Sequence, residues 1–293
     1  MKKRLPDWFK RKLPEPKTML EMKNLLEGAR LHTICESGQC PNIWECFSKR
    51  TAAFLILGDV CTRRCTFCAV KKGSPTPVDE NEPQHLLETV EKLGLRHVVI
   101  TSVTRDDLPD GGASHFARTI NLLRRNLKDI TVEVLIPDFL GSAQALKTVV
   151  ESNPHVINHN LETVPRLYPV VRPKADYQRS LALLALIKRL NPKMLTKSGL
   201  MLGLGETAEE IITVMKDLKD RSCSLLTIGQ YLQPSPAHHP VVRFVSPDEF
   251  NGYRQSGLEI GFADVASAPL VRSSFKASET YTKAKEYLAL KSR

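Results

Sequence analysis

Three cysteines stand within eight positions of the sequence, in the stretch CTRRCTFC. Cys61, Cys65 and Cys68 are separated first by three residues and then by two. Structural zinc is one alternative, but closed zinc sites use four ligands, and no histidine or further cysteine follows nearby. Three thiolates suit a 4Fe–4S cluster in which three irons are anchored and the fourth stays open to another ligand. The spacing therefore favours an iron–sulfur cluster with one open iron.

A second group of cysteines lies upstream, in CESGQCPNIWEC. Cys35, Cys40 and Cys46 are separated by four and then five residues, again without a fourth ligand close by. A zinc loop or a set of buried thiols would also explain them. Their position among polar and glycine residues, just before another cysteine cluster, favours a second iron–sulfur centre. The seventh cysteine, Cys223, has no partner at a metal-binding spacing, and we expect it to be an ordinary buried thiol.

Composition narrows the class of protein. With 293 residues and 42% hydrophobic content, the chain can bury the core of one large domain or of two small ones, and one domain is the first expectation. No run of about 18 apolar residues occurs, and no apolar stretch follows the charged start, so we expect a cytoplasmic protein that neither leaves the cell nor spans a membrane. The crowding of six cysteines argues against a disulfide framework. The net charge of +10 indicates an acidic partner, which could be nucleic acid, a protein or an anionic cofactor.

The elements that position the cysteines follow a βα rhythm, in which β-branched apolar runs alternate with stretches of helical period. The expected strands are 52–57, 97–102, 130–136, 155–160, 199–202 and 225–232. The expected helix signals are Pro83 with Gly94, Ser142, and the capping boxes Thr207 with Glu210 and Ser246 with Glu249. Six units are too few for a closed eight-stranded barrel, and a dinucleotide fingerprint is lacking. We therefore predict an α/β fold, a partial and open parallel (β/α)6 barrel.

Chemistry in such a barrel belongs at the carboxyl ends of the strands, and Cys61 comes soon after the first of them. The other residues that follow strands are Asp59, 102–107, Pro137, 158–162, 203–206 and Gln233. We predict a barrel over 51–245, an N-terminal extension over 1–50 that carries the upstream cysteine group, and a C-terminal extension over 246–293 packed on the same domain.

Placed after a first barrel strand, CTRRCTFC resembles the signature of the radical S-adenosylmethionine (SAM) enzymes, and Phe67 fits the aromatic residue that is usual before the last cysteine. In that family the open iron chelates the methionine amino and carboxylate groups of SAM, and reductive cleavage gives a 5'-deoxyadenosyl radical. Further stretches, HTICESGQCPNIWEC, SVTRDDLPDGGA, NHNLETV, MLGLGET and VRSSF, resemble the lipoyl synthase family. The resemblance covers nearly the whole chain, from His32 to Phe275.

This resemblance implies an auxiliary 4Fe–4S cluster on the upstream cysteines, Cys35, Cys40 and Cys46. It also implies that Ser274, in the motif Arg-Ser-Ser-aromatic, is the remaining ligand of that cluster. Phe275 replaces the commoner tyrosine, which changes a neighbour of the ligand and not the ligand itself. Cys61, Cys65 and Cys68 would then hold the radical cluster. We expect two 4Fe–4S clusters and SAM as cofactors.

The implied activity is that of a sulfurtransferase of lipoate biosynthesis. It inserts sulfur at C6 and C8 of an octanoyl group on a lysine of an acidic lipoyl carrier domain or glycine-cleavage H protein. The auxiliary cluster donates the sulfur, and two equivalents of SAM are expected because each carbon needs its own hydrogen abstraction. The further partners expected are an electron donor such as flavodoxin or ferredoxin and an iron–sulfur carrier that rebuilds the cluster. No nucleic acid or membrane partner is expected.

Assignments of SAM contacts depend on residues after the later strands. The candidates are Asn158, Asn160, Glu162, Arg172, Gly203 and Gly205. The first three could bind the ribose or methionine part, or cap a strand end; Arg172 could bind a carboxylate or be a solvated surface charge. The two glycines could admit an adenosine or serve a tight turn.

For the charged residues near the cysteines, we consider contacts with the cluster loop and with the carrier protein. Asp106 and Asp107 could be partners of the cluster loop or exposed acids. The basic residues that could meet the acidic carrier, or be solvated, are Arg63, Arg64, Lys71 and Lys72.

Two alternatives stay open at this point. A radical SAM methylthiotransferase acting on RNA would use the basic charge for phosphate contacts, although no separate RNA-binding module is apparent. A non-enzymatic, zinc-stabilised binding protein would need four ligands at each site.

Overall fold

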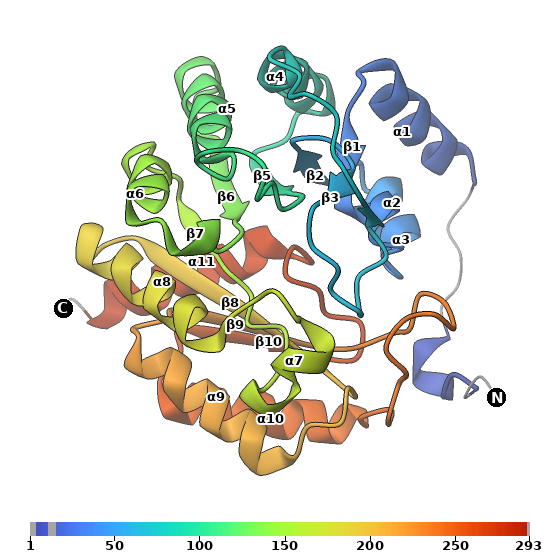
Figure 1. Cartoon of the computed structure of the whole chain (residues 1–293), viewed down its shortest axis with the longest axis vertical. Coiled ribbons are helices and arrows are strands. Elements are labelled where there is room, and N and C mark those ends of the chain that lie inside the picture. The colour runs from blue at the N-terminus through green and yellow to red at the C-terminus, as the bar shows by residue number, and fades with distance from the viewer. Residues whose placement is uncertain (1–3, 11–15, 292–293) are drawn as a thin grey trace. The chain divides into compact units, whose positions relative to one another are not determined.

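The computed structural model describes residues 4–10 and 16–291, and its contacts divide the chain into two compact units (Figure 1). The N-terminal unit comprises Lys12–Arg64 and Ala69–Ile157, and the C-terminal unit comprises Met1–Arg11, Cys65–Cys68 and Asn158–Arg293. The radical motif is thus shared, with Cys61 in the first unit and the other two cysteines in the second. The ends of the two predicted extensions, 1–3 and 292–293, and the stretch 11–15 lie outside the described residues.

Parallel strands form the sheet of the N-terminal unit, in the order β1-β2-β5-β6-β7. Strand β2 pairs parallel with β5, and β5 pairs parallel with β6, while the two-residue strand β1 pairs antiparallel with β2. The strands are β1 (His32–Thr33), β2 (Ala53–Ile56), β5 (His97–Ser102), β6 (Thr131–Leu135) and β7 (Val156–Asn158), with a separate pair β3 (Val60–Cys61) and β4 (Lys71–Lys72). The strands β2, β5 and β6 are largely buried, as expected for β-branched runs covered on both faces.

Helices of the N-terminal unit begin and end at the signals that the sequence carries. Gly94 ends α4 in the left-handed conformation, with φ of 63°, and the Ser142 hydroxyl accepts a hydrogen bond from the Ala145 N–H at the start of α6. Figure 1 shows α4, α5 and α6 side by side. The helices are α1 (Pro16–Gly28), α2 (Ile34–Ser37), α3 (Ile43–Ser48), α4 (Glu82–Leu93), α5 (Ala113–Asn126), η2 (Phe139–Gly141) and α6 (Ala143–Glu151).

The C-terminal unit has three parallel strands in the order β8-β9-β10. Both predicted capping boxes are present, Thr207 with Glu210 at the start of α9 and Ser246 with Glu249 at the start of α10. The elements are η1 (Asp7–Phe9), η3 (Pro165–Leu167), α7 (Tyr168–Val171), α8 (Tyr177–Leu190), β8 (Leu195–Leu202), α9 (Ala208–Asp220), β9 (Leu225–Gln230), α10 (Pro247–Ile260), β10 (Asp264–Ser267) and α11 (Ala277–Lys291).

The expected open and mostly parallel α/β fold is confirmed, with differences at strand ends. Strand β8 begins at Leu195 and not at 199, because Thr196, Lys197 and Ser198 are polar but wholly buried, so hydrophobicity does not reveal them. Strand β7 stops at Asn158. The short strand β10, with sequence DVAS, carries too little apolar pattern to be predicted.

The structure bears on the expected burial of Cys223 and on whether any helix could span a membrane. Cys223 is fully buried, and burial raises the pKa of its thiol to about 12, so the prediction of an ordinary buried thiol is confirmed. Within residues 4–10 and 16–291, every helix is too short or too polar to cross a lipid bilayer.

Candidate active site

The first cysteine triplet is gathered by two short helices of the N-terminal unit. Cys35 lies in α2, Cys46 lies in α3, and Cys40 lies in the turn between them. The Thr33 hydroxyl caps α2 by accepting from the Glu36 N–H, and the Cys40 N–H donates to the Cys35 carbonyl at 2.9 Å. The three thiols are close enough to influence one another electrostatically. The predicted cluster ligands of this triplet are therefore neighbours in space.

Burial dominates the electrostatics of this triplet. It raises the pKa of the Cys35 thiol to about 12, with a further rise from Cys40 and Cys46, and raises that of Cys46 to about 11. Iron binds the thiolate form, so cluster assembly must displace these protons. Three soft sulfur donors in one place fit an iron–sulfur cluster. In the part of the chain that the structure describes, no three His, Cys, Asp or Glu side chains converge tightly enough for a single metal ion.

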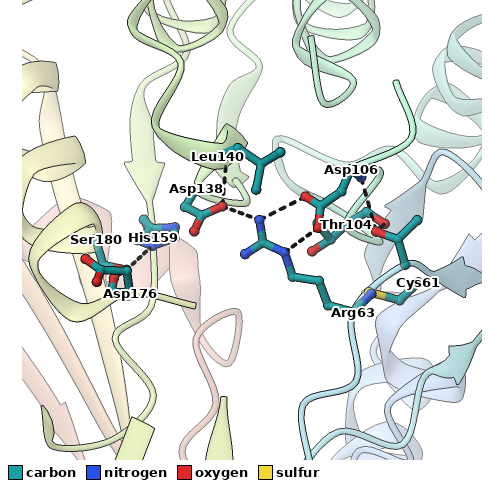
Figure 2. A network of polar contacts seen from close by, with 10 residues as sticks. Cys61, Arg63, Thr104, Asp106, Asp138, Leu140, His159, Asp176 and Ser180 are labelled. Atoms are coloured by element: carbon teal, nitrogen blue, oxygen red, sulfur yellow. Dashed lines mark hydrogen bonds and ion pairs between the residues drawn. The ribbon is translucent and has the colours of Figure 1, made fainter. Parts of the chain in front are cut away.

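The loop that carries Cys61 is tied to the loops after β5 and β6 by a buried arginine (Figure 2). The side chain of Arg63 is only 5% exposed and binds Asp106 through two nitrogens, at 2.8 and 2.9 Å. One of these nitrogens, Nη2, also donates to Asp138 at 2.6 Å. The Thr62 hydroxyl adds a bond to the Thr104 carbonyl at 2.9 Å. Asp106 is thus a partner of the cluster loop, and the expectation that Arg63 meets a carrier protein is wrong.

The other charged residues near this loop are arranged differently. Arg105 is buried and binds the partly exposed Asp107 at 2.8 Å, and this hydrogen bond lowers the pKa of that carboxyl. Lys71 is exposed and pairs with Asp59 at 2.6 Å. Of the basic residues expected near the carrier, Arg64, Lys71 and Lys72 are exposed.

The remaining cysteines of the radical motif are held in the C-terminal unit by backbone hydrogen bonds. The Thr66 N–H donates to the Val171 carbonyl, and the His239 N–H donates to the Thr66 carbonyl, each at 3.0 Å. His238 Nε2 lies 3.1 Å from the Cys68 carbonyl; because a carbonyl only accepts, this nitrogen carries the proton. The segment Cys65–Cys68 therefore lies between the end of α7 and the loop that follows β9.

Arg172 contacts residues of the same site and is not a solvated surface charge. Its Nη1 donates to the carbonyls of Asn160 and Leu161, each at 3.0 Å, and its guanidinium lies over the Tyr168 ring. Burial opposes its charge, but Tyr168, Glu162 and the Cys65 thiol keep the pKa of Arg172 above its ordinary value. The positive charge of Arg172 thus acts on a predicted cluster ligand.

Buried polar atoms without partners mark the end of β7. Asn158 is fully buried, and neither its amide oxygen nor its amide nitrogen has a hydrogen-bond partner. Asn160 Oδ1 and Arg172 Nε are also unpartnered. Such groups cost free energy unless a ligand or water satisfies them, so the end of β7 offers hydrogen-bonding groups for a polar ligand or water. The amino, carboxylate and ribose groups of SAM offer the donors and acceptors that these atoms lack.

Glu162 belongs to this set of polar groups as well. It adopts φ of 66°, a conformation uncommon for residues other than glycine, in the segment that follows β7. Burial raises the pKa of its carboxyl above the ordinary value, while Arg172, the Asn160 amide and Arg272 act to lower it. The side chain accepts a hydrogen bond from Asn160 Nδ2 at 3.0 Å.

The two serines of the VRSSF stretch have different surroundings. Ser273 Oγ accepts a hydrogen bond from Asn160 Nδ2 at 2.7 Å. The hydroxyl of Ser274 takes part in none of the hydrogen bonds made by the described residues. Of the two, Ser274 is therefore the serine whose oxygen is available to a ligand.

The glycines of MLGLGET have conformations that need glycine, with φ of 95° at Gly203 and 115° at Gly205. A Cβ at Gly203 would lie 2.1 Å from the amide nitrogen of Gln230, so this glycine also lets the turn pack on β9. The Glu206 carboxylate closes the turn by accepting from the N–H groups of Gly203 and Leu204, at 2.6 and 2.9 Å. The position of Glu206 after a strand is the sequence signal that could reveal its role in closing this turn. The sequence carries no such signal for Gln230, against which Gly203 packs.

Comparisons with known proteins agree with these features. Residues 55–218 match the family model described as the Radical SAM superfamily. The chain is 57% identical over 274 residues to a lipoyl synthase of Caldanaerobacter subterraneus subsp. tengcongensis, covering 94% of this chain and 96% of that protein. It is 53% identical over 284 residues to a lipoyl synthase of Alkaliphilus metalliredigens, covering 97% of this chain and 98% of that protein.

A likeness to solved structures supports the fold. The crystal structure of Streptococcus suis SuiB bound to S-adenosylmethionine matches with a TM-score of 0.58 and 12% identity, over 86% of this chain and 60% of that one. At this level of identity the likeness concerns the fold alone. Full-length identity above one half, together with the matched radical SAM region, decides the family. The chain belongs to the lipoyl synthase family of the radical SAM superfamily.

Proposed function

We propose that this chain inserts two sulfur atoms, at C6 and C8, into an octanoyl group carried on a lysine of a lipoyl carrier protein. The observation that carries the proposal is the 57% identity to a lipoyl synthase over 94% of the chain. This range includes the two cysteine triplets of the sequence. The RNA methylthiotransferase is not better supported by these comparisons.

The radical chemistry is assigned to the second triplet and the residues after β7. Cys61, Cys65 and Cys68 would hold one 4Fe–4S cluster, and the SAM contacts would come from Asn158, Asn160, Glu162, Arg172, Gly203 and Gly205. Bound there, the cluster and SAM supply a radical able to abstract hydrogen from an unactivated C–H bond, a step that acid–base groups cannot perform.

The residues of the chain prepare this site in two ways. The buried Arg63 holds the loop of Cys61 to two carboxylates, which fixes the loop before any cofactor arrives. Arg172 places a positive charge near Cys65, which stabilises the thiolate that iron requires.

The sulfur substrate is the auxiliary cluster, assigned to Cys35, Cys40, Cys46 and Ser274. The unengaged Ser274 hydroxyl supports its role as the fourth ligand, since Ser273 is already hydrogen bonded. An alkoxide is a hard ligand on an iron otherwise held by soft thiolates, and this weak match suits a ligand that must leave as the cluster is dismantled. The first extension, 1–50, and the last, 246–293, would thus provide the ligands of the sulfur donor, around a barrel over 51–245.

The partners follow from the charge and from the chemistry. The net charge of +10 and the exposed Arg64 and Lys72 favour an acidic carrier domain, such as a lipoyl domain or glycine-cleavage H protein. Reductive cleavage of SAM needs an electron donor such as flavodoxin or ferredoxin, and the spent cluster needs an iron–sulfur carrier. A cytoplasmic location fits these partners.

The proposal is tested with protein purified without oxygen and given reductant, SAM and a peptide that carries octanoyl-lysine. Mass spectrometry should show the octanoyl peptide converted to lipoyl peptide, with about two SAM cleaved for each lipoyl group formed. The Cys35→Ala variant is the matched control and should cleave SAM without forming lipoyl product. Cleavage of SAM by the wild type without any sulfur in the peptide would contradict the proposal.

A further inference from the structure

The amide of Asn160 joins two parts of the C-terminal unit that the proposed function assigns to different cofactors. Its nitrogen donates to Ser273 Oγ at 2.7 Å and to Glu162 Oε1 at 3.0 Å. Its oxygen is buried and has no partner. A Cβ at Gly199 would lie 2.8 Å from that oxygen, so glycine in β8 leaves the amide room. The amide nitrogen of Asn160 is thus hydrogen bonded to Ser273, whereas the amide oxygen has no hydrogen-bond donor.

The backbone of Asn160 extends this connection toward the radical motif. Its carbonyl accepts from Arg172 Nη1 at 3.0 Å, and the charge of Arg172 interacts with the Cys65 thiol. A short series of contacts within one unit therefore leads from Cys65 through Arg172 and Asn160 to Ser273.

The segment that leads to Ser273 and Ser274 is held against β9 by backbone hydrogen bonds. The Ala268 N–H donates to the Ile228 carbonyl, and the Gln230 N–H donates to the Pro269 carbonyl, each at 3.1 Å. The Phe275 N–H then donates to the Arg272 carbonyl at 2.9 Å, which closes a turn with Ser273 and Ser274 at its two central positions. The turn restrains the backbone of both residues, so a contact that fixes Ser273 also limits the positions that Ser274 can take.

We infer that Asn160 is a positioning residue that couples occupation of the SAM site to the hold of Ser274 on the auxiliary cluster. This inference rests on the proposed function. A donor from bound SAM satisfies Asn160 Oδ1 and fixes the orientation of the amide, so the nitrogen stays directed at Ser273. Ser274 is then held in its ligand position. Departure of SAM frees the amide and loosens Ser274, and by linkage the auxiliary cluster strengthens SAM binding by the same factor.

The test follows release of iron to a chelator from the oxidised protein, in which no SAM cleavage takes place. Release is measured with and without SAM, and the contribution of the radical cluster is subtracted with the variant that lacks Cys35, Cys40 and Cys46. SAM should slow release of auxiliary iron about fivefold in the wild type, the size expected for one neutral hydrogen bond. Ser273→Thr keeps the hydroxyl and should keep the effect. In Ser273→Ala the effect should fall below about twofold.

The matched control is Ser278→Ala, the same substitution at an exposed position nearby, and it should behave as the wild type. Equal slowing in Ser273→Ala, or none in a wild type that forms lipoyl product, would overturn the inference and leave the proposed function standing. A wild type without auxiliary iron or without SAM binding would contradict the proposed function as well.

A second measurement keeps the inference testable if Ser273→Ala holds no auxiliary iron. The dissociation constant of SAM, measured by equilibrium dialysis, should be about fivefold larger in the variant without Cys35, Cys40 and Cys46 than in the wild type. Gly229→Ala should raise the dissociation constant of SAM similarly. The new Cβ would lie 2.1 Å from the Val271 carbonyl oxygen and displace the segment that contains Ser273. Gly252→Ala, where a Cβ meets nothing within 4 Å, is its control. Equal constants in all these proteins would overturn the inference.

Discussion

The first cysteine triplet and the Cys61 loop of the second triplet are held by different kinds of structure. The first lies on two short helices and the turn between them, with local backbone hydrogen bonds such as that from Cys40 to Cys35. The loop of the second is fixed at Cys61 by a buried arginine between two carboxylates. Local turns can re-form around a new cluster, whereas a buried ion-pair network resists change. The difference agrees with our proposal that the cluster of the first triplet is consumed and that of the second keeps its geometry.

Removing each triplet separately should separate the two roles most strongly. With two clusters the wild type should hold about eight irons, and replacing either triplet by alanine should leave about half. The variant without Cys61, Cys65 and Cys68 should cleave no SAM. The variant without Cys35, Cys40 and Cys46 should cleave SAM within about threefold of the wild-type rate but form no lipoyl product. Iron analysis and chromatography of 5'-deoxyadenosine measure these outcomes; full iron content in either variant would remove the distinction.

The rigidity of the second triplet can be tested at Arg63. Arg63→Met removes the arginine that forms an ion pair with the buried Asp138, and we expect a loss of about 3–5 kcal/mol in the free energy of unfolding of the cluster-free chain. Arg63→Lys should recover only part of this, because an ammonium group cannot reproduce the two-nitrogen contact with Asp106. Urea unfolding measures the loss. Arg64→Met, at the exposed neighbouring position, should change stability by less than about 0.5 kcal/mol, and an equal effect at the two arginines would contradict the proposed anchor.

Consumption of the auxiliary cluster can be tested at Ser274, the serine that we propose as its ligand. Ser274→Ala should lower lipoyl formation at least about 100-fold while SAM cleavage persists, because the lost ligand belongs to the sulfur donor. Ser273→Ala should be milder. Ser274→Cys supplies a soft ligand, so it should retain iron but release it more slowly during turnover. Single-turnover product analysis by mass spectrometry measures this series, and wild-type activity in Ser274→Ala would exclude the ligand assignment.

Much of this arrangement could be predicted from the sequence, because cysteine spacing and helix caps act locally. The caps at Ser142, Thr207 and Ser246 depend on residues within one turn and were found where expected. The hydrogen bond of Asn160 to Ser273 joins residues 113 positions apart, and nothing in either local stretch indicates it. The role of Arg63 was missed for the same reason, since its two carboxylates lie on other loops and its charge suggested a surface position.

The smallest effect concerns the cysteine outside the two triplets. Folding raises the pKa of Cys223 from an ordinary value of 9.0 to about 12, because burial disfavours the thiolate. Its contribution to stability is therefore complete below pH 9 and is lost as the pH rises from 9 toward 12. Cys223→Ala should remove this part of the pH dependence, and the native wild-type thiol should resist alkylation at pH 8. Rapid alkylation of Cys223 in the folded protein would contradict its burial.

The origin of the inserted sulfur tests the account most directly. The clusters are reconstituted with isotopically labelled sulfide, excess sulfide is removed, and the reaction proceeds in unlabelled medium with reductant, SAM and octanoyl peptide. Mass spectrometry should show two labelled sulfur atoms in the product, at most one lipoyl group for each chain, and an earlier intermediate with one sulfur still attached to the cluster. Unlabelled sulfur in the product, or many turnovers without any system to rebuild the cluster, would show that the triplet of Cys35, Cys40 and Cys46 is not the donor.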